Sequence, residues 1–338
     1  MTAPPLLELH QLHVQIETPL GSADILRGLD VTLAPGERLG IVGESGSGKS
    51  MMALAIMGLL PASARASGRV EFSGEDLLAA EEARLCGIRG RKIAMIFQEP
   101  MTALNPVQTI EDQVAEGPML HLGLSRRQAS DHAKDLLARV DLPPERVSPR
   151  LYPHQLSGGQ RQRVMIAIAL ACEPSLLIAD EPTTALDVTV QAGILDLIVE
   201  LTRERGMGLI MISHDLGVIT RTTDRTAVMY AGRFVETGKT LHFLGSMAHP
   251  YSQGLYKAMP QHAARSDKPA RQRPRLPTIA GTVPDPLQPI KGCAFSSRCR
   301  HVEPDCRVTA PELMSLAPDH FVACHHPQEQ EHLLESIR

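Results

Sequence analysis

Aromatic side chains are scarce in this 338-residue chain, which has no tryptophan, 4 tyrosines and 6 phenylalanines. Proteins that bind single-stranded nucleic acid usually stack bases on such side chains. The net charge of −4 also argues against a broad basic surface. We therefore expect no nucleic acid among the partners of this chain.

Long apolar runs are missing as well. The longest, Met51–Leu60 and Val164–Cys172, reach only about half of the roughly 20 residues that span a bilayer. Glu8 and Glu17 interrupt the apolar N-terminal residues, and no basic segment precedes them, so we predict no signal peptide. These features indicate a cytosolic chain, in which the six cysteines are not expected to form disulfides.

Strand-like and helix-like patterns alternate along most of the chain, which predicts an α/β fold with a mainly parallel sheet. A helix is predicted from Lys49 to Leu60, ended by Pro61. An inserted helical subdomain is predicted at about 107–165, because residues 107–155 are charged and contain no convincing strand pattern. The β-rich segments are 6–43, Lys92–Gln98, Ser175–Asp180, Met207–Ser213 and Arg225–Ala231.

The composition changes after Pro250, because 12 of the 26 prolines lie in the last 89 residues. Residues 265–275 hold five basic side chains against Asp267 alone, which is typical of an exposed linker. We therefore predict two domains, at 1–250 and 251–338. Four of the six cysteines lie in the second, at 293, 299, 306 and 324.

One loop carries a phosphate-binding pattern. Residues 43–50 fit G-x-x-x-x-G-K-[ST] and lie between a predicted strand and a predicted helix. The glycines let backbone N–H groups turn inward, and the helix start adds unpaired N–H groups and a positive dipole. Lys49 can reach the β- and γ-phosphates, and Ser50 can ligate Mg²⁺. The predicted nucleotide contacts are Gly43, Glu44, Ser45, Gly46, Ser47, Gly48, Lys49, Ser50 and Met51.

A second element supports the first. Residues 176–180 form an apolar strand pattern that ends in Asp180, a carboxylate suited to Mg²⁺. Glu181 follows immediately and is placed to polarise an attacking water. Together the two elements predict nucleotide hydrolysis.

Between these elements lies Leu156-Ser157-Gly158-Gly159-Gln160, a second pair of glycines at a predicted helix start. Together with Gln98, Ala185-Leu186-Asp187 and His214, it completes an ordered set of motifs over residues 36–232. This set resembles the ATP-binding-cassette (ABC) family. The resemblance implies a P-loop ATPase core with an antiparallel β subdomain and a helical subdomain.

The resemblance also implies roles for matching residues. Ser50, Gln98 and Asp180 would serve Mg²⁺. Glu181 would be the general base, and His214 would hold the γ-phosphate and the water. In the family two subunits sandwich ATP head to tail, so part of each site comes from the partner. The residues implied at that dimer seam are Ser157, Gly158, Gly159, Gln160 and Asp187.

One feature departs from the family pattern. The family usually stacks adenine on an aromatic residue upstream of the phosphate loop, whereas this chain has no Phe, Trp or Tyr before Phe72. We expect an aliphatic residue, Leu20 or Ile25, to take that place.

The amino-acid sequences of segments 97–106, 180–188 and 249–255 resemble those of the ATPases of dipeptide and oligopeptide importers. This implies a peripheral subunit on the cytoplasmic face of the inner membrane. Its partners would be a second homologous ATPase in a heterodimer, two permease subunits and, indirectly, a solute-binding protein. Nickel, glutathione or another small solute remains an alternative cargo, and a soluble ABC ATPase of repair or translation is a further alternative.

The four clustered cysteines follow the pattern C-x5-C-x6-C-x17-C. Thiolates so placed can tie together a segment with little core of its own. Relatives in the importer branch carry a [4Fe–4S] cluster here, and the resemblance implies one at Cys293, Cys299, Cys306 and Cys324. Zn²⁺ is an alternative, weakened because no C-x2-C pair is present, and unliganded thiols are a third. A structural role and a sensing role both stay open.

Overall fold

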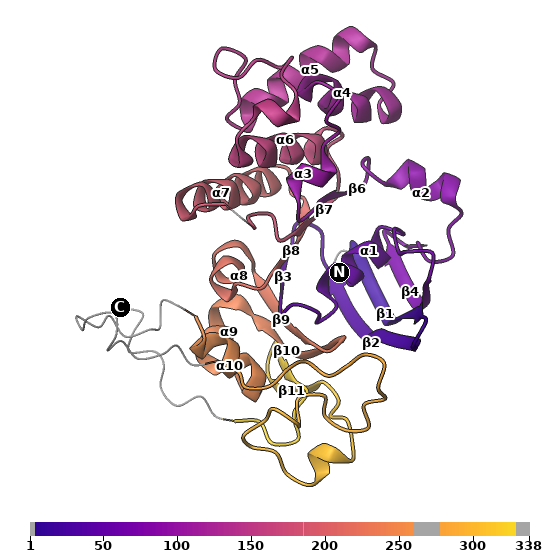
Figure 1. Ribbon diagram of the computed structural model, residues 1–338, viewed down its shortest axis with the longest axis vertical. Coiled ribbons are helices and arrows are strands. Elements are labelled where there is room, and N and C mark those ends of the chain that lie inside the picture. Colours follow the sequence, from indigo (N-terminus) through magenta and orange to yellow (C-terminus); the bar gives the residue numbers. More distant parts are fainter. Residues whose placement is uncertain (1–3, 185, 260–277, 329–338) are drawn as a thin grey trace, which may run out of the picture.

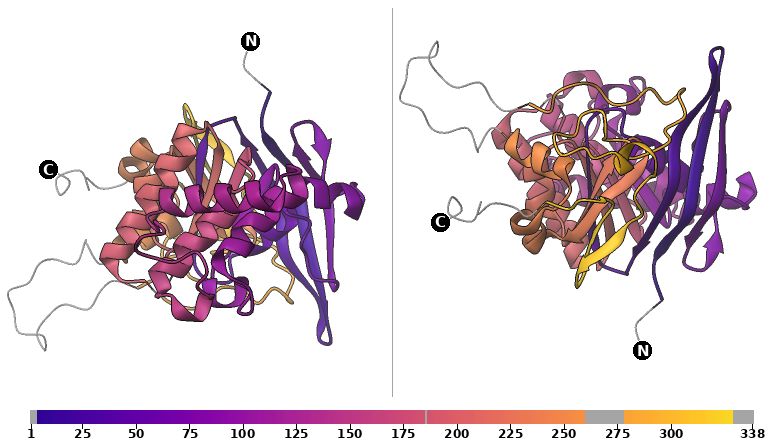
Figure 2. Two further views of the ribbon diagram at one scale, coloured as in Figure 1. Left: turned by 90° about the horizontal axis from the view of Figure 1, so that it is seen from above. Right: turned by 90° about the horizontal axis from the view of Figure 1, so that it is seen from below.

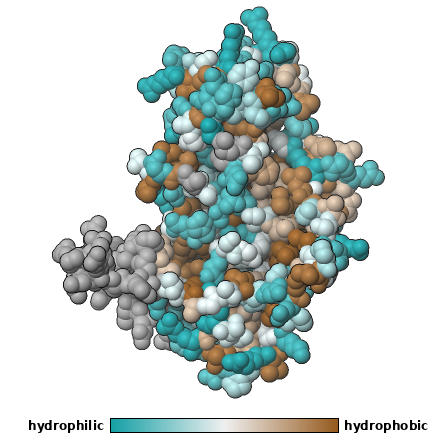
Figure 3. All heavy atoms as spheres, viewed as in Figure 1, coloured by the Kyte–Doolittle hydropathy of each residue, from teal (hydrophilic) through white to brown (hydrophobic). Residues whose placement is uncertain are grey.

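Two sheets and a helical layer make up the computed structural model (Figure 1), which describes residues 4–184, 186–259 and 278–328. The predicted linker at 265–275 and Ala185 lie outside the described residues. None of the described helices is both long and apolar enough to cross a membrane. On the face shown in Figure 3, hydrophobic side chains form separate patches between hydrophilic ones.

The main sheet has the strand order β11-β12-β10-β9-β3-β8-β7-β6. Its five strands from β9 to β6 pair in parallel, as the sequence predicts, and β10, β12 and β11 continue it in antiparallel fashion. The antiparallel edge was not predicted. The strands are β3 (Arg38–Val42), β6 (Ile93–Ile96), β7 (Leu176–Asp180), β8 (Gly208–Ser213), β9 (Arg225–Tyr230), β10 (Arg233–Lys239), β11 (Met314–Ala317) and β12 (His320–Val322).

A second, antiparallel sheet has the order β2-β1-β4-β5. Its inward side chains, including Leu12, Leu26 and Leu29, are fully buried in one core with the side of the main sheet that α1 covers. Figure 2 shows this sheet standing beside the rest of the molecule. The strands are β1 (Leu7–Thr18), β2 (Gly21–Leu33), β4 (Ala64–Phe72) and β5 (Glu75–Asp76).

Helices α3 to α6 lie near the β6 edge of the main sheet and form the upper part of Figure 1. Between residues 107 and 155, all of which are described, the structure has helices and no strand, as the sequence predicts. The α-helices are α1 (Lys49–Ile56), α2 (Glu82–Ile88), α3 (Pro100–Ala103), α4 (Ile110–His121), α5 (Arg126–Arg139), α6 (Gly158–Leu170), α7 (Val188–Glu204), α8 (Leu216–Thr222), α9 (Thr240–Ser246) and α10 (Pro250–Lys257). The described residues also form the 3-10 turns η1 (Pro153–Gln155) and η4 (Asp305–Arg307).

Helix α1 is shorter than the sequence predicts, because it ends at Ile56 and not at Leu60. Gly58 follows with a φ of 62°, the left-handed conformation that glycine adopts without strain. The N–H of Gly58 donates to Ala55 O and that of Leu59 to Leu54 O, the paired bonds of a Schellman motif. The glycine therefore stops the helix before Pro61 is reached.

The C-terminal segment, meaning the described residues 251–259 and 278–328, is built into the main sheet. Strand β12 pairs with β10, and the ring of His320 lies 2.8 Å from the carboxylate of Glu236 on β10. Glu236 is fully buried and also accepts the N–H groups of Ala248 and His249. Phe295 belongs to the main core as well. The sequence analysis expected a segment with little core of its own, whereas the structure packs part of this segment into the main core.

The bond between Glu236 and His320 should anchor β12. We expect His320→Leu to lower the free energy of unfolding by about 3 kcal/mol, because it leaves a buried carboxylate short of one partner. Chemical denaturation measures this, and limited proteolysis should show earlier cleavage after residue 300. The control is Phe321→Leu at the next, 40 % exposed position. Equal stability of the two variants would contradict the anchoring role.

Candidate active site

The predicted phosphate loop follows β3 and leads into α1. A Cβ on Gly43 would lie 2.2 Å from the carbonyl oxygen of Met229, so only glycine fits there. Gly46 and Gly48 have φ values of 78° and 105°, which other residues rarely adopt. No side chain caps the start of α1. Its first backbone N–H groups, and its positive dipole end, are therefore available to an anion.

Lys49 lies in the loop as predicted, almost buried at 5 % exposure. Its Nζ donates to the carbonyl oxygens of Gly43 at 2.8 Å and Glu44 at 3.0 Å. Burial lowers the pKa of Lys49, and the nearby carboxylates of Glu181, Asp180 and Glu44 oppose that shift. The ammonium group is thus bonded to the phosphate loop and lies near enough to the acidic residues at the end of β7 to feel their charge.

Asp180 ends β7 and is 4 % exposed. Burial raises the pKa of this carboxyl, while a hydrogen bond from Ser50 lowers it. Within the described part of the chain, its Oδ1 has no hydrogen-bond partner. A buried carboxylate oxygen without a partner, next to a hydroxyl in a phosphate loop, is a donor set that suits Mg²⁺.

Two other predicted residues, Gln98 and His214, meet at the carboxylate of Glu181. Its carboxylate Oε2 lies 3.2 Å from Gln98 Nε2, 3.1 Å from His214 Nδ1 and 3.1 Å from the Thr184 hydroxyl. Its φ of 46° is unusual for a non-glycine residue, and such strain is held only where surrounding contacts fix it. Thr184 was missed by the sequence analysis because hydroxyls in turns are common.

The second predicted pair of glycines, in residues 156–160, lies at the start of α6. Ser157 caps this helix and forms a capping box with Gln160, and Gly158 is exposed. A Cβ on Gly159 would lie 2.8 Å from Val190 of α7, the helix that Asp187 caps. In the described residues no hydrogen bond joins 157–160 to the phosphate loop, so the structure does not bring these two predicted parts together within one chain.

The two candidate adenine contacts differ in their surroundings. Leu20 is 84 % exposed in the turn between β1 and β2. Ile25 packs against the core and lines a cavity of about 180 Å³ together with Gly46 of the phosphate loop. Ile25 is therefore the better placed of the two.

The four predicted cysteine ligands line one small cavity, together with His249, His301, His325 and His326. Burial raises the pKa of Cys293, Cys299 and Cys324, the last to about 11. No three of the described thiols have sulfur atoms within 4.8 Å of one another. Sulfurs around one Zn²⁺ would be about 3.8 Å apart, so the thiols are spaced more widely than a zinc site requires.

Another group of possible ligands overlaps this cavity. The Cys306 sulfur, the His326 ring and the Asp305 carboxylate lie within 4.8 Å of one another. The His326 ring contacts both carboxylate oxygens of Asp305 at 3.0 Å, and this pair is at least partly exposed to solvent. Exposed acidic and imidazole groups of this kind are common without a metal, so we assign no ion to them.

Comparisons with known proteins identify the family of this chain. The "ABC transporter" family model matches residues 26–184, and the "Oligopeptide/dipeptide transporter, C-terminal region" model matches residues 235–306. The oligopeptide transport ATP-binding protein OppD of Salmonella typhimurium is 46 % identical over 325 residues, which cover 96 % of this chain and 95 % of that protein. The chain belongs to the ABC transporter family. OppD of Escherichia coli is 45 % identical, over 97 % of this chain and 95 % of its own.

Solved structures of ABC proteins share the fold. The dimeric ATP-binding cassette MJ0796, in a post-hydrolysis state with ADP and Pi, is 28 % identical with a TM-score of 0.63. The match covers 69 % of this chain and 98 % of the MJ0796 chain. CbiO1 of Clostridium perfringens is 27 % identical with a TM-score of 0.60, over 71 % of this chain and 90 % of its own. This ABC protein is therefore an ATPase with the cassette fold.

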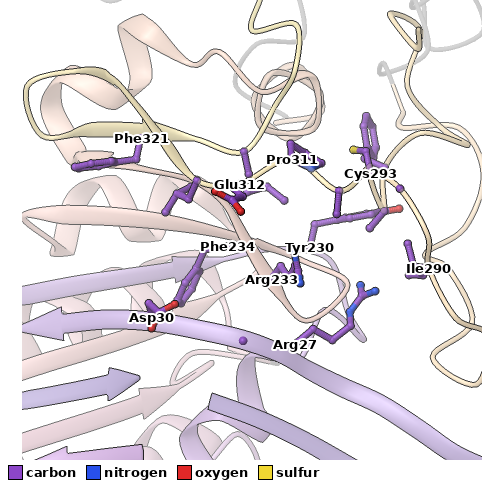
Figure 4. A pocket seen from close by; sticks show the side chains of 18 of the residues that line it. Arg27, Asp30, Tyr230, Arg233, Phe234, Ile290, Cys293, Pro311, Glu312 and Phe321 are labelled. Carbon is purple, nitrogen blue, oxygen red and sulfur yellow. The ribbon is translucent and has the colours of Figure 1, made fainter. Parts of the chain in front are cut away.

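A larger cavity, of about 720 Å³, lies away from the phosphate loop of this ABC ATPase. Figure 4 shows it between the antiparallel sheet and the C-terminal segment, with Arg27 and Arg233 on one side and Glu312 opposite them. Cys293 lines both this cavity and the thiol cavity. Among the described residues, no carboxylate pairs with either arginine.

Two contacts of the phosphate loop were also missed by the sequence analysis. Tyr251 and Arg298, both from the C-terminal segment, bind Glu44 in the loop. The chain separations are 207 and 254 residues, and no local pattern signals a pairing over such a distance.

The backbone of Gly46 offers a clean test of the loop. A Cβ there meets nothing within 4 Å, so Gly46→Ala adds only the strain of a positive φ, about 1 kcal/mol. We expect it to weaken binding of a fluorescent ATP analogue severalfold. The control is Gly74→Ala, which has a φ of 83° and is equally open but lies in a turn between β4 and β5. Equal analogue affinity in the two variants would show that the loop conformation is not needed for binding.

Proposed function

We propose that this chain powers the import of di- and oligopeptides through a membrane permease, as a peripheral ATPase on the cytoplasmic face of the inner membrane. The observation that carries the proposal is the match of residues 235–306 to the oligopeptide/dipeptide transporter C-terminal region. The near full-length similarity to two OppD proteins supports it.

The site residues take the following roles in ATP hydrolysis. The free N–H groups of the loop and Lys49 bind the phosphates. Ser50, Asp180 and Gln98 hold Mg²⁺, which when bound neutralises charge developing on the phosphates. Glu181 accepts the proton of the attacking water. His214 and Gln98, both within 3.2 Å of its carboxylate, keep that carboxylate pointed at the water.

The second half of each site comes from another subunit. Ser157 and Gly158 are exposed at the start of α6, where they can reach ATP on a facing phosphate loop, and Asp187 lies at the same seam. The related cassette MJ0796 is dimeric. We assign the partner to a second, homologous ATPase, so that the working unit is a heterodimer.

The permease contact lies beside Gln98. Phe97 and Val107 are 39 % and 79 % exposed, and Leu120 in the helical layer is 73 % exposed. Exposed apolar side chains of this kind are available to an apolar partner surface. A cytoplasmic helix of each of two permease subunits would cover such a surface. The solute-binding protein outside the membrane would act only through the permease.

Glu181 provides the test of the function. We expect Glu181→Gln, in the importer assembled with its partner ATPase and permease, to leave ATP binding intact and to slow hydrolysis at its own site at least about a hundredfold. Uptake of a labelled tripeptide should stop with it. The control is Glu200→Gln on the exposed face of α7.

Two outcomes would contradict the proposal in different ways. Unchanged turnover in a complex whose other site is inactivated would show that Glu181 is not the base. A wild-type complex that hydrolyses ATP and takes up nickel or glutathione, but no peptide, would replace the proposed solute and leave the site roles standing.

We also propose that the four thiols hold a [4Fe–4S] cluster. The support is that Cys293, Cys299, Cys306 and Cys324 line one cavity, and that their sulfurs are too widely spaced for one zinc ion. The thiols are spaced more widely than one zinc ion needs, and the cavity between them, about 10 Å³, would have to widen to admit the cluster. When bound, the cluster would cross-link the turns that carry its ligands.

Metal analysis tests this assignment. Anaerobically purified protein should be brown and contain about four iron and four sulfide per chain. Cys299→Ser should lose most of this iron, and Cys86→Ser, an exposed thiol on α2, should keep it. One zinc per chain, or no metal after anaerobic handling, would refute the cluster.

A further inference from the structure

The phosphate loop is bound by an arginine from the far end of the chain. Arg298 Nη1 donates to Glu44 Oε2 at 2.6 Å, and Nη2 donates to Oε1 at 3.0 Å. Such paired bonds fix both the distance and the orientation of the two groups. The Arg298 side chain is only 3 % exposed, and that of Glu44 is 30 % exposed. Water therefore screens this pair much less than it would a surface salt bridge.

The guanidinium is itself held in place. Its Nε donates to the carbonyl oxygen of Ala280 at 2.8 Å, Nη2 also donates to Ile279 O, and Nη1 also donates to the Tyr230 hydroxyl. With the two bonds to Glu44, all the N–H groups of the arginine have acceptors. The group also lies near the rings of Tyr230 and Phe295, 5.7 and 5.8 Å from their centroids. The hydrogen bond to Glu44 is the main reason that the pKa of Arg298 is raised.

Each polar group of Glu44 is hydrogen-bonded to another residue. Its N–H donates to the Tyr251 hydroxyl at 2.8 Å, and its carbonyl oxygen accepts from Lys49 Nζ and from the N–H of Ser47. Its carboxylate is held by Arg298. Two of the three polar groups of this loop residue are therefore bound by side chains of the C-terminal segment, Tyr251 and Arg298.

The charge of this glutamate matters as much as its position. Glu44 is the second residue of the loop that binds phosphates, and a free carboxylate there would repel them. Two unit charges several ångströms apart at a partly exposed site interact by an amount that corresponds to about tenfold in affinity. Arg298 cancels this charge and draws the carboxylate toward the C-terminal segment.

The same arginine belongs to the turns that carry the thiols. Arg298 precedes Cys299, its N–H donates to Phe295 O, and the N–H of Ser296 donates to Cys293 O. The position of the guanidinium is therefore set by the fold of residues 293–299. Cys293 and Cys299 face the thiol cavity, and Arg298 faces the phosphate loop.

We propose that Arg298 is a positioning residue for ATP binding, which neutralises Glu44 and holds the phosphate loop in its nucleotide-binding conformation. Because the fold of residues 293–299 sets the position of Arg298, it also affects the conformation of the nucleotide site. This inference rests on the ATPase activity of the family and on no assumption about the transported solute.

The test compares Arg298→Met with wild type in the assembled complex, where the partner ATPase carries a substitution that prevents its own nucleotide binding. We expect ATP-analogue affinity to fall about tenfold and the KM for ATP to rise with it, with kcat changed much less. The second variant is Arg298→Met with Glu44→Gln, which removes the unneutralised charge and should recover most of the affinity. The control is Arg300→Met, an exposed arginine on the other side of Cys299.

The outcomes separate a positioning role of Arg298 in ATP binding from a purely structural role. If Arg298→Met lowers the melting temperature or the iron content but leaves analogue affinity within about twofold of wild type, the inference is wrong. It is also wrong if adding Glu44→Gln gives no recovery, because the charge would then not be the cause. Failure of the complex to import peptide does not bear on either result, since both are read from nucleotide affinity.

Discussion

The nucleotide site depends on backbone N–H groups that must stay ordered and yet unpaired. Helix α1 begins without a side-chain cap, and a cap would occupy the very donors that an anion needs. Because its backbone N–H groups must stay unpaired, the phosphate loop has to be ordered through its other atoms. Lys49 holds loop carbonyls from inside, and Tyr251 and Arg298 hold Glu44 from outside. The C-terminal segment thus supplies rigidity that the loop cannot supply for itself.

The parallel part of the main sheet brings the reacting groups together. Gly43, Asp180 and His214 lie at the carboxyl ends of the adjacent strands β3, β7 and β8, and in open α/β sheets this edge is where ligands bind. Residues far apart in sequence therefore converge on Glu181 without any local signal between them. The strained backbone of Glu181 is held by the same contacts, so the geometry of the site and its strain have one origin.

The sequence predicted the parts of this protein whose physics is local. The phosphate loop, the acidic end of β7 and the capped start of α6 each follow from a short run of residues with a fixed backbone requirement. The parallel strands followed from apolar runs. The end of α1 was misplaced because Pro61 is a conspicuous helix breaker, whereas Gly58 stops the helix through its φ. Non-local contacts escaped prediction altogether. The pairing of β12 with β10 and the bond from Arg298 to Glu44 join residues more than 80 and 250 positions apart, and composition carries no trace of them.

The contacts within this chain complete only one side of the site, and that has a chemical consequence. His214 is 62 % exposed and Glu181 15 %, so water reaches the group proposed as the base. Interactions with the phosphates gain strength when water is excluded. On the proposed arrangement, residues 157–160 of a second subunit cover this side of the site. Hydrolysis then becomes fast only when the two subunits are closed on each other. Binding is then governed by contacts inside the chain, including Arg298, and turnover by contacts between chains. A motor that must hold ATP before it closes requires such a separation.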